Sequence, residues 1–440
     1  MYLIFDTETT GLPNSFKAPV DELENWPRLV QLAWQVHEED GSLIAARNYI
    51  VKPEGFTIPF NSVKVHGIST ERAEEEGYQL NEVLEAFLKD LNNSEYLIAH
   101  NISFDEKILG AEFIRAEYDA DLILKANQIC TGKGTANFCQ LPGGKGKNYK
   151  MPKLNELHQV LFGEGFEEAH NAAADVEATA RCFLEALRRD VFYISNDKIT
   201  EEKIKELKTK TEDIVQPTVE KKDGKEEDKD TTQKSNKKVN IKEPFSHLHC
   251  HSQFSILQGT TSIKDLVGKA KVLEMPAITL TDHGNMFGGF NFIKEASDNG
   301  IKPILGCEFY ITKDRHKKKF TKDNKDKRNL QVFLAKNKKG YFNLSKLSTL
   351  GYVEGFYAIY PRIDKELVQE YKDDLIALTG GLKGEIPDLI LNEGEHEAEK
   401  AFKWWHDLFG DDFYVELNRH GLEEEEHVNK ILMNFAEKYG

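Results

Sequence analysis

The sequence predicts two mixed α/β domains joined by a charged linker, and three observations support this architecture. A chain of 440 residues is too long for one ordinary core. Short apolar runs that suit strands alternate with segments of helical periodicity. Residues 194–243 interrupt this alternation with charged and polar side chains, which cannot bury enough surface to offset the entropy of ordering. We therefore expect domains at residues 1–193 and 244–440, with a flexible linker between them.

The composition argues against several classes of protein. Hydrophobic residues make up 40% of the chain, but no apolar run approaches the roughly 18 residues that a membrane span needs. The first residues, MYLIFDTET, lack the basic segment of a signal peptide. The five cysteines are widely spaced without a CxxC pair, so they encode neither a disulfide framework nor a zinc ribbon. We expect a protein of the reducing cytoplasm without membrane contact.

The formal net charge of −16 argues against general electrostatic attraction to nucleic acid. It does not exclude a nuclease, because an enzyme that gathers carboxylates to hold divalent metals is locally acidic. The bulk charge therefore decides little about function.

The first domain is predicted to be a sheet covered by helices. Apolar runs that suit strands, the first three of them forming a meander, lie at residues 2–5, 29–36, 42–51 and 96–99. Helical periodicity follows at residues 81–91, 104–114, 153–162 and 171–189.

Four acidic residues and one histidine stand where this scaffold can gather them. Asp6 and Glu8 end the first strand, and their spacing of two places both side chains on one face. Asp105 follows the fourth strand at a helix start, and Asp175 lies on the last helix, five residues after His170. Divalent cations prefer carboxylate oxygens, and two metals about 3.5–4 Å apart can stabilise both oxygens of a phosphodiester displacement. Each piece alone is weak, so the hypothesis depends on their conjunction.

The strings that carry these residues are DTETTGL at 6–12, AHNISFD at 99–105 and HNAAADV at 170–176. Together they resemble the three motifs of the DEDDh exonucleases, and specifically the proofreading exonucleases of bacterial DNA polymerase III. The resemblance covers roughly residues 1–190. It implies an RNase H-like fold and the removal of nucleotides from a 3′ end.

The same resemblance implies roles for individual residues. Two Mg²⁺ or Mn²⁺ ions would be held by the acidic set, which is Asp6, Glu8, Asp105 and Asp175. His170 would be the general base, because an imidazole with a pKa of about 6.5 can accept a proton at cellular pH. The residues beside the 3′-terminal nucleotide would be Thr9, Leu12 and His66, although the apolar Leu12 could equally belong to the core.

Residues 131–153 are open to two interpretations. They combine glycines and the aromatic residues Phe138 and Tyr149 with five lysines, which are Lys133, Lys145, Lys147, Lys150 and Lys153. Such a loop could follow the phosphates of a single strand, or it could be a solvated excursion. It does not contain the string of a nucleotide-binding P-loop.

The second domain is predicted to repeat a strand and a helix, as in a parallel sheet or a βα barrel. In a barrel the strand ends converge on one face, where polar side chains could meet around a metal. The polar residues at the ends of the first three predicted strands are His247, His249, His251, Asp282, His283 and Glu308.

Four strings of this domain are HLHCHSQFS, TDHGNMFGGFNFIKEA, GIKPILGCEFYIT and LAKNKKGYFNL. They resemble the PHP (polymerase and histidinol phosphatase) domain of bacterial replicative polymerases of the polymerase III alpha type, over about residues 245–440. The resemblance implies a distorted βα barrel. It also implies a site for Zn²⁺ or another transition metal at His249, His251, His283 and Glu308.

Two positions depart from the pattern of metal-bearing PHP domains. Gln258 stands where an Asp is usual, and Leu330 stands where a His is usual. Glutamine and leucine bind metal poorly or not at all. The departures favour a structural docking module over an active phosphoesterase, and both interpretations stay open.

The strand count up to Gly440 predicts a barrel that is incomplete at its C-terminal end, and no polymerase palm is expected in this chain. We therefore expect the front portion of a longer DNA-directed DNA polymerase. Its predicted function is proofreading: a 3′→5′ exonuclease that releases nucleoside monophosphates from DNA in the bacterial cytoplasm. The expected partners are a primer terminus and other replisome subunits.

Two alternatives from other classes remain open. One is a stand-alone 3′ exonuclease acting on DNA or RNA, with a structural or phosphoesterase PHP module. The other is a binding platform whose metal centres are idle. Replacing Asp6 or His170 by Ala would distinguish the exonuclease from the platform, because the function of a binding platform would not change.

Overall fold

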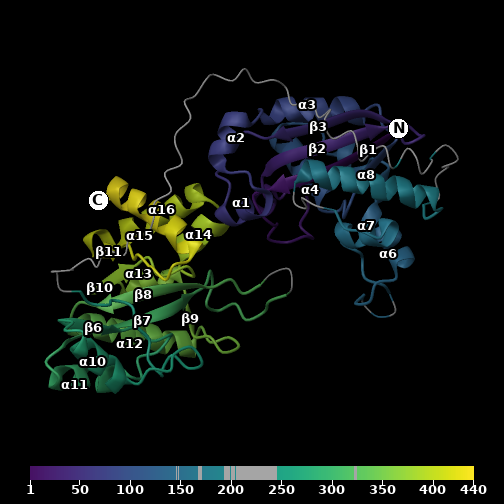
Figure 1. Ribbon diagram of the computed structural model, residues 1–440. Coiled ribbons are helices and arrows are strands. Elements are labelled where there is room, and N and C mark those ends of the chain that lie inside the picture. The colour runs from purple at the N-terminus through teal and green to yellow at the C-terminus, as the bar shows by residue number, and fades with distance from the viewer. Residues whose placement is uncertain are drawn as a thin grey trace, which may run out of the picture. The chain divides into compact units, whose positions relative to one another are not determined.

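The computed structural model describes residues 1–144, 146, 148–166, 171–192, 199, 204, 245–321 and 325–440. The chain divides into two compact units, residues 1–223 and 224–440, and each is described by itself (Figure 1). Most of the predicted linker at residues 194–243 lies outside the described residues, so its bounds stay a prediction. Within the described residues, no helix is long and apolar enough to cross a membrane.

A five-stranded mixed sheet in the order β3-β2-β1-β4-β5 forms the centre of the first unit. Its strands are β1 (Tyr2–Thr9), β2 (Leu29–His37), β3 (Leu43–Ile50), β4 (Tyr96–Ala99) and β5 (Gln128–Cys130). The first three strands form an antiparallel meander, whereas β4 runs parallel to β1 and β5 runs parallel to β4. The predicted meander and fourth strand are confirmed.

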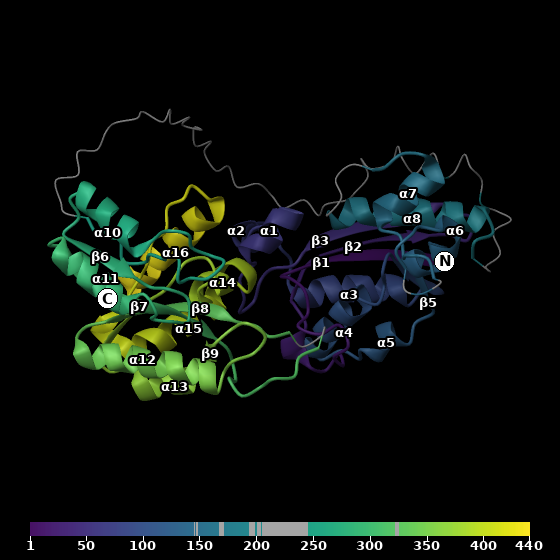
Figure 2. The same ribbon diagram turned by 90° about the horizontal axis from the view of Figure 1, so that it is seen from below.

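Helices cover both faces of this sheet. The helices of the first unit are η1 (Leu23–Asn25), α1 (Phe60–His66), α2 (Thr70–Glu76), α3 (Leu80–Leu91), α4 (Asp105–Arg115), α5 (Asp121–Leu124), α6 (Thr131–Cys139), α7 (Leu154–Phe162) and α8 (Ala172–Arg188). Figure 2 shows α8 on one side of the strands and α3 and α4 on the other. The four predicted helices correspond to α3, α4, α7 and α8, with ends within one residue of those expected.

The alternation of β1 sends its apolar side chains into two separate cores. Leu3 and Phe5 pack on the α3 and α4 side, together with Phe87. Tyr2 and Ile4 pack on the other side, against α8. The same alternation continues into the polar end of β1 and decides which helix each functional side chain meets.

The start of the basic segment at residues 131–153 was expected to be a loop and is instead the helix α6. The loop was expected because the segment contains two closely spaced glycines, Gly132 and Gly134. A Cβ at Gly134 would lie 2.2 Å from the Phe192 ring, and one at Gly132 would lie 3.1 Å from Met151. The glycines therefore allow close packing of a helix and do not mark a flexible loop.

The second unit contains a mixed sheet in the order β11-β10-β8-β7-β6, and β9 pairs with β7 outside this path. Its strands are β6 (Ala277–Leu280), β7 (Lys302–Ile311), β8 (Asn329–Ala335), β9 (Arg362–Ile363), β10 (Leu375–Leu378) and β11 (Phe413–Tyr414). Its helices are α10 (Ile263–Val272), α11 (Gly289–Asp298), α12 (Lys338–Val353), α13 (Lys365–Tyr371), α14 (Glu385–Asn392), α15 (Glu395–Phe409), η4 (Gly410–Asp412) and α16 (Glu423–Tyr439).

Two details of the second unit differ from a regular strand and helix repeat. Residues 245–251 form no strand. The Cys250 carbonyl accepts a hydrogen bond from the Thr281 N–H, but the Cys250 N–H donates to the Thr281 hydroxyl and not to a backbone carbonyl, so no regular ladder forms. Strand β8 runs antiparallel to β7, because the described residues of their connection contain no crossover helix. The parallel pair β6 and β7 agrees with the prediction.

Candidate active site and candidate metal centre

The first cluster of functional side chains lies where the polar end of β1 meets the start of α8. Asp6 and Glu8 share the face of Tyr2 and Ile4, which is the face that α8 covers. Asp175 lies in the first turn of α8. Ligand atoms of Asp6, Glu8 and Asp175 all lie within 4.8 Å of one another.

The start of α8 is positioned by a helix cap. The Asn171 side chain accepts a hydrogen bond from the backbone N–H of Ala173, which satisfies one of the free donors at the helix start. The side chain of Gln31, the partner of Glu8 on β2, also accepts a bond from the Ala172 N–H at 3.4 Å. The capped helix therefore presents Asp175 at a defined place beside the strand.

Asp105 joins the acidic set from the opposite side of the sheet. It opens α4, and its side chain is only 3% exposed. The Thr7 hydroxyl, which lies between Asp6 and Glu8 in sequence and faces α4, donates a 2.7 Å hydrogen bond to Asp105 Oδ1. This bond connects the strand to the helix and fixes the orientation of the carboxylate.

Burial and mutual repulsion raise the pKa values of these acids. Burial, together with the charges of Asp105, Asp175 and Glu8, holds the pKa of Asp6 well above its usual range. Burial and the charges of Asp175 and Asp105 raise the pKa of Glu8 to about 8, and Asp175 is the larger of the two charge effects. For Asp105, burial outweighs the hydrogen bond from Thr7 and raises its pKa to about 7.

The chemistry of this donor set fits divalent cations. The structure contains no Lys or Arg paired with Asp6 or Glu8 among the described residues. A hard cation supplies positive charge to such a site and prefers carboxylate oxygens. The structure brings Asp6, Glu8 and Asp175 together, whereas Asp105 lies outside this candidate ligand group and is linked to β1 through the Thr7 hydroxyl. The metal roles of the four acids are taken up below as a proposal.

His170, the predicted general base, lies outside the described residues. Its neighbour Asn171 is described and caps α8. The role of His170 therefore stays a prediction.

The three residues predicted beside the 3′-terminal nucleotide differ in exposure. Leu12 is 76% exposed, so it is not part of a core. Thr9 is buried, and its hydroxyl donates to the Gly11 carbonyl at 2.7 Å. His66 Nδ1 accepts the N–H of Ile68 at 3.1 Å, and burial lowers the pKa of this imidazole to about 4. The backbone of Thr9 opposes that lowering, which places His66 near the end of β1.

The lysines of residues 131–153 bear on whether this segment could bind a nucleic-acid strand. The Lys150 ammonium pairs with the Glu156 carboxylate at 2.6 Å, so its charge is compensated within the segment. Lys145 and Lys147 lie outside the described residues. The interpretation of this segment as a path for a strand stays untested.

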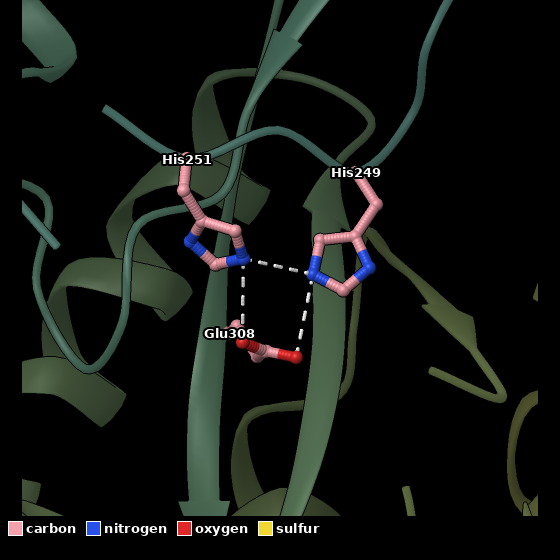
Figure 3. Close-up of side chains that lie close together, drawn as sticks. All are labelled: His249, His251 and Glu308. Carbon is pink, nitrogen blue, oxygen red and sulfur yellow. Dashed lines mark hydrogen bonds and ion pairs between the residues drawn. The ribbon is translucent and has the colours of Figure 1, made fainter. Parts of the chain in front are cut away.

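The second cluster lies in the second unit and combines imidazoles with a carboxylate. Ligand atoms of His249, His251 and Glu308 all lie within 4.8 Å of one another. Figure 3 shows both rings turned toward Glu308, with the two Nε2 atoms 3.1 Å apart. Nδ1 of His283 approaches Glu308 Oε2 at 2.7 Å without the alignment of a hydrogen bond. Three of the four predicted metal ligands therefore form the candidate ligand group, and His283 adjoins it through Glu308.

The two charge types in this cluster compensate each other. Burial alone would lower the pKa of His249, but contacts with Glu308 and Glu416 outweigh it and raise that pKa to about 10. Burial would raise the pKa of Glu308, but its close contacts with the His249 and His283 rings lower that pKa to about 2. Burial lowers the pKa of His251 to about 4, so this ring is neutral at cellular pH.

A buried aspartate holds the histidine loop in place. Asp282 accepts hydrogen bonds from the Ser252 N–H at 2.7 Å and from the hydroxyls of Ser252 and Ser255 at 2.8 and 2.7 Å. Asp282 therefore positions the loop and is absent from the candidate ligand group. His247 also lies outside that group and packs against the Phe245 ring at 4.9 Å.

Sequence analysis missed Glu416. Its Oε1 accepts a 2.8 Å hydrogen bond from His249 Nδ1, although the two residues lie 167 positions apart. The only sequence signal is the single acid in FYVELN, which resembles many solvated acids. Only the tertiary fold brings it to the histidines.

The two positions that depart from metal-bearing relatives have other partners. Gln258 is exposed, and its side chain donates to the Tyr310 hydroxyl at 3.0 Å. Leu330 lies on β8 opposite Tyr310. Neither residue belongs to the candidate ligand group.

Comparison with known families identifies the two units. Residues 3–183 match the family model described as Exonuclease, and residues 247–420 match the model described as PHP domain. The chain therefore combines a nuclease domain of the hydrolase class with a PHP domain, in a mixed α/β fold.

The curated sequence relatives are DNA polymerase subunits. DNA polymerase III subunit alpha of Borreliella burgdorferi is 42% identical over 205 residues, which are 46% of this chain and 18% of that protein. The subunit of Aquifex aeolicus is 47% identical over 202 residues, which are 44% of this chain and 17% of that protein. The chain is thus a relative of DNA polymerase III subunit alpha, and the match spans less than a fifth of the length of these curated relatives.

Solved structures similar to this chain include exonuclease I of E. coli in complex with a dA16 oligonucleotide. That likeness covers 43% of this chain and 40% of the other, with 19% identity and a TM-score of 0.33.

Proposed function

We propose that the exonuclease domain hydrolyses DNA from its 3′ end and releases nucleoside monophosphates. The observation that carries this proposal is the convergence of Asp6, Glu8 and Asp175, whose ligand atoms lie within 4.8 Å. The Exonuclease match over residues 3–183 supports it independently.

Two Mg²⁺ or Mn²⁺ ions fit the acidic set as cofactors, held by Asp6, Glu8, Asp105 and Asp175. When bound, such a pair stabilises the charge on the attacking and leaving oxygens of a phosphodiester displacement. Asp6 and Glu8 supply oxygens from one strand face, and Asp175 supplies them from the capped start of α8. Asp105, oriented by the Thr7 hydroxyl, completes the set.

His170 is proposed to accept the proton of the attacking water. An imidazole suits this step because its ordinary pKa lies near cellular pH. Its place in the HNAAADV string, five residues before Asp175, supports the assignment.

Leu12, Thr9 and His66 are proposed to contact the terminal nucleotide. The 76% exposed side chain of Leu12 offers an apolar surface on which a base can rest. The backbone near Thr9 and the imidazole of His66 lie together at the end of β1 and offer polar contacts.

We further propose that this activity proofreads a primer terminus in the bacterial cytoplasm, alongside replisome subunits. The relatedness to DNA polymerase III subunit alpha supports this context. On this proposal the chain contributes proofreading within a longer DNA-directed DNA polymerase.

Digestion of a 5′-labelled single-stranded DNA in Mg²⁺ tests the proposal. A ladder that shortens stepwise from the 3′ end is expected, and the double variant Asp6→Ala, Glu8→Ala should lower its rate more than about 1000-fold. The matched control is Glu74→Ala, Glu75→Ala, which removes two exposed acids of α2 from the same domain. Equal rates in the two double variants, or no digestion by a folded wild-type chain in Mg²⁺ or Mn²⁺, would contradict the proposal.

A second substrate in the same assay distinguishes a DNA-specific proofreading enzyme from a general 3′ exonuclease. An RNA of the same sequence should be digested much more slowly by a proofreading enzyme, whereas comparable rates would favour a general 3′ exonuclease.

For the PHP domain we propose a structural role. The compensated pair of His249 and Glu308, and the Gln258 side chain bonded to Tyr310, support this role over phosphoesterase chemistry. His249, His251, His283 and Glu308 would be the residues that hold Zn²⁺ or another transition metal. Metal content by mass spectrometry, together with hydrolysis of p-nitrophenyl phosphate, tests this: stoichiometric metal with activity that Glu308→Gln abolishes would overturn the structural role.

A further inference from the structure

The connection between β7 and β8 in the PHP domain is the most unexpected charged feature of the molecule. Within residues 312–328, the part that the structure describes carries eight Lys or Arg residues and two Asp residues. The whole chain has a formal net charge of −16. A basic segment in an acidic protein is a candidate site for an anionic partner where its charge is not compensated internally.

A fully buried arginine fixes the shape of this connection. The Arg362 guanidinium donates to the carbonyls of Arg315 and Lys317 at 3.1 and 2.8 Å, and to the Gly355 carbonyl at 2.9 Å. It also pairs with the Asp326 carboxylate at 2.8 Å. Arg362 therefore holds both ends of the basic connection against the turn that follows α12.

A second set of contacts brings the connection to the aromatic part of that turn. The Lys318 ammonium donates to the carbonyls of Glu354 and Phe356 at 2.6 and 2.8 Å. The rings of Phe320 and Tyr357 lie 4.9 Å apart. The basic connection and the turn thus form one continuous surface.

Part of the positive charge is compensated within the domain. The Arg315 guanidinium pairs with Asp364, Glu354 and Glu366, and Arg328 pairs with Asp326. Lys327 lies 4.0 Å from the Glu393 carboxylate.

Three lysines have no such compensation from the part of the chain that the structure describes. Lys313, Lys319 and Lys325 are exposed, and no described residue forms an ion pair with any of them. Their ammonium groups stand on a backbone that Arg362 and Lys318 have already ordered. The surface is therefore positively charged and preorganised.

Exposed aromatic rings lie at the end of α12 and on the turn that the Lys318 ammonium contacts. Tyr352 and Phe356 stack with ring centroids 5.9 Å apart and an angle of 16° between the ring planes, and they are 40% and 44% exposed. Phe287 is 62% exposed and lies 6.5 Å from the Tyr352 ring. The lysine-bearing connection and the ring-bearing turn contact each other through Lys318. Together they offer what a single strand requires, which is cations for the phosphates and flat faces for the bases.

We propose that Lys313, Lys319 and Lys325, together with Tyr352, Phe356 and Phe287, form a binding surface for single-stranded nucleic acid. The lysines contact phosphates and the rings stack on bases. This surface lies in the PHP domain and is independent of the exonuclease site. An acidic peptide would match the lysines but not the stacked rings, so nucleic acid is the favoured partner.

The test uses the full chain with Asp6→Ala and Glu8→Ala, in EDTA, and a fluorescent circular oligothymidylate as the probe. A circle has no 3′ end, so its binding does not depend on the proposed exonuclease function. The triple variant Lys313→Gln, Lys319→Gln, Lys325→Gln is expected to weaken binding by on the order of tenfold or more at low salt. The slope of log K against log[salt] should fall by about 2, at about 0.7 per phosphate contact.

The matched control removes three exposed lysines from another part of the same domain, by Lys264→Gln, Lys269→Gln and Lys302→Gln. It should leave binding within about twofold, since these lysines have no aromatic neighbour in the proposed surface. An equal loss in the two triple variants would overturn the proposal, because it would indicate general electrostatics.

The aromatic half of the surface has its own test. Phe356→Ala is expected to weaken binding by on the order of tenfold with an unchanged salt slope, because stacking involves no counterion release. Tyr414→Ala, which removes an exposed ring on β11, is the control. Undetectable binding of the circle by the parent chain would overturn the proposal. Equal binding of anionic lipid vesicles, lost in the same variants, would overturn it in favour of a membrane surface.

Discussion

The two candidate sites of this chain solve the problem of buried charge in opposite ways. In the exonuclease domain, burial and the charges of neighbouring acids raise the pKa values of Asp6, Glu8 and Asp105. In the PHP domain, a proton on His249 lowers the pKa of Glu308 to about 2 while its own pKa rises to about 10. The first cluster needs positive charge from outside, whereas the second supplies its own.

This difference is informative about function. A buried cluster of like charges is costly unless a cation completes it, so its presence indicates a catalytic or binding role. A compensated cluster is stable without any ligand and is compatible with a structural role. The comparison predicts opposite responses to the same kind of substitution in the two domains.

The largest expected effect concerns His170, the proposed general base of the exonuclease site. His170→Ala should lower the rate of 3′ digestion by about 10²–10⁴-fold, the usual contribution of a general base. Its binding of Mn²⁺, measured by electron paramagnetic resonance, should remain near that of the wild type. His406→Ala, on α15 of the other domain, is the control. A rate within twofold of the wild type would remove His170 from the mechanism.

In the PHP domain, removal of the central carboxylate should be strongly destabilising. Glu308→Gln is expected to lower the free energy of unfolding of this domain by about 3 kcal/mol, because it removes one of the two carboxylates that hold the buried His249 imidazolium and leaves only Glu416. Hydrogen exchange of the β7 and β8 amides, followed by mass spectrometry, measures this. The exposed Glu370→Gln is the control. An unchanged exchange rate would mean that the cluster is not compensated as described.

The exonuclease domain should show a pH dependence in EDTA that Mg²⁺ suppresses. The pKa of Glu8 is raised from its ordinary value of 4.5 to about 8, so the folded state binds more protons than the unfolded state between these values. The stability that protonated Glu8 contributes to the folded state is therefore fully present below pH 4.5, and it is lost as the pH rises through about 8.

Between pH 5.5 and 7.5, Glu8 alone should lower the free energy of unfolding by about 2–3 kcal/mol. Hydrogen exchange of the β1 and β2 amides at the two pH values, corrected for intrinsic exchange, measures the slope. Glu8→Gln should flatten it. A slope that is equally steep in saturating Mg²⁺ would show that the carboxylates do not bind the cation.

The smallest expected effect is a stabilisation, whereas Glu308→Gln is expected to destabilise its domain. Asp6→Asn should stabilise the exonuclease domain in EDTA by about 1–2 kcal/mol, because it removes one of several repelling buried acids. The same variant should lose Mg²⁺-dependent protection of the β1 amides. Asp21→Asn, an exposed acid in the same domain, is the control. Destabilisation by Asp6→Asn in EDTA would contradict the picture of an uncompensated cluster.

Local sequence patterns predicted much of the fold and of the first site. A spacing of two put Asp6 and Glu8 on one strand face, and helical periodicity located α8, which carries Asp175. The alternation of β1 also explains why Thr7 meets Asp105 on the opposite side, although this bond was not foreseen.

The features that were missed depend on tertiary contacts. Glu416 reaches His249 across 167 residues and has no motif of its own. The helix α6 was missed because Gly132 and Gly134 resemble loop residues, whereas their lack of a Cβ makes room for Met151 and Phe192. The segment at 245–251 alternates like a strand, yet the fold gives it no regular ladder in the described residues.

The pairing of β1 with β2 restricts how this domain can vary in evolution. Asp6 lies opposite Ala33 and Glu8 opposite Gln31. Deletion of a single residue earlier in β1 would move both acids to the α4 face and put Thr7 and Thr9 in their places on the α8 face. Tolerated insertions and deletions within this strand should therefore come in pairs of residues, which keep the acids beside Asp175.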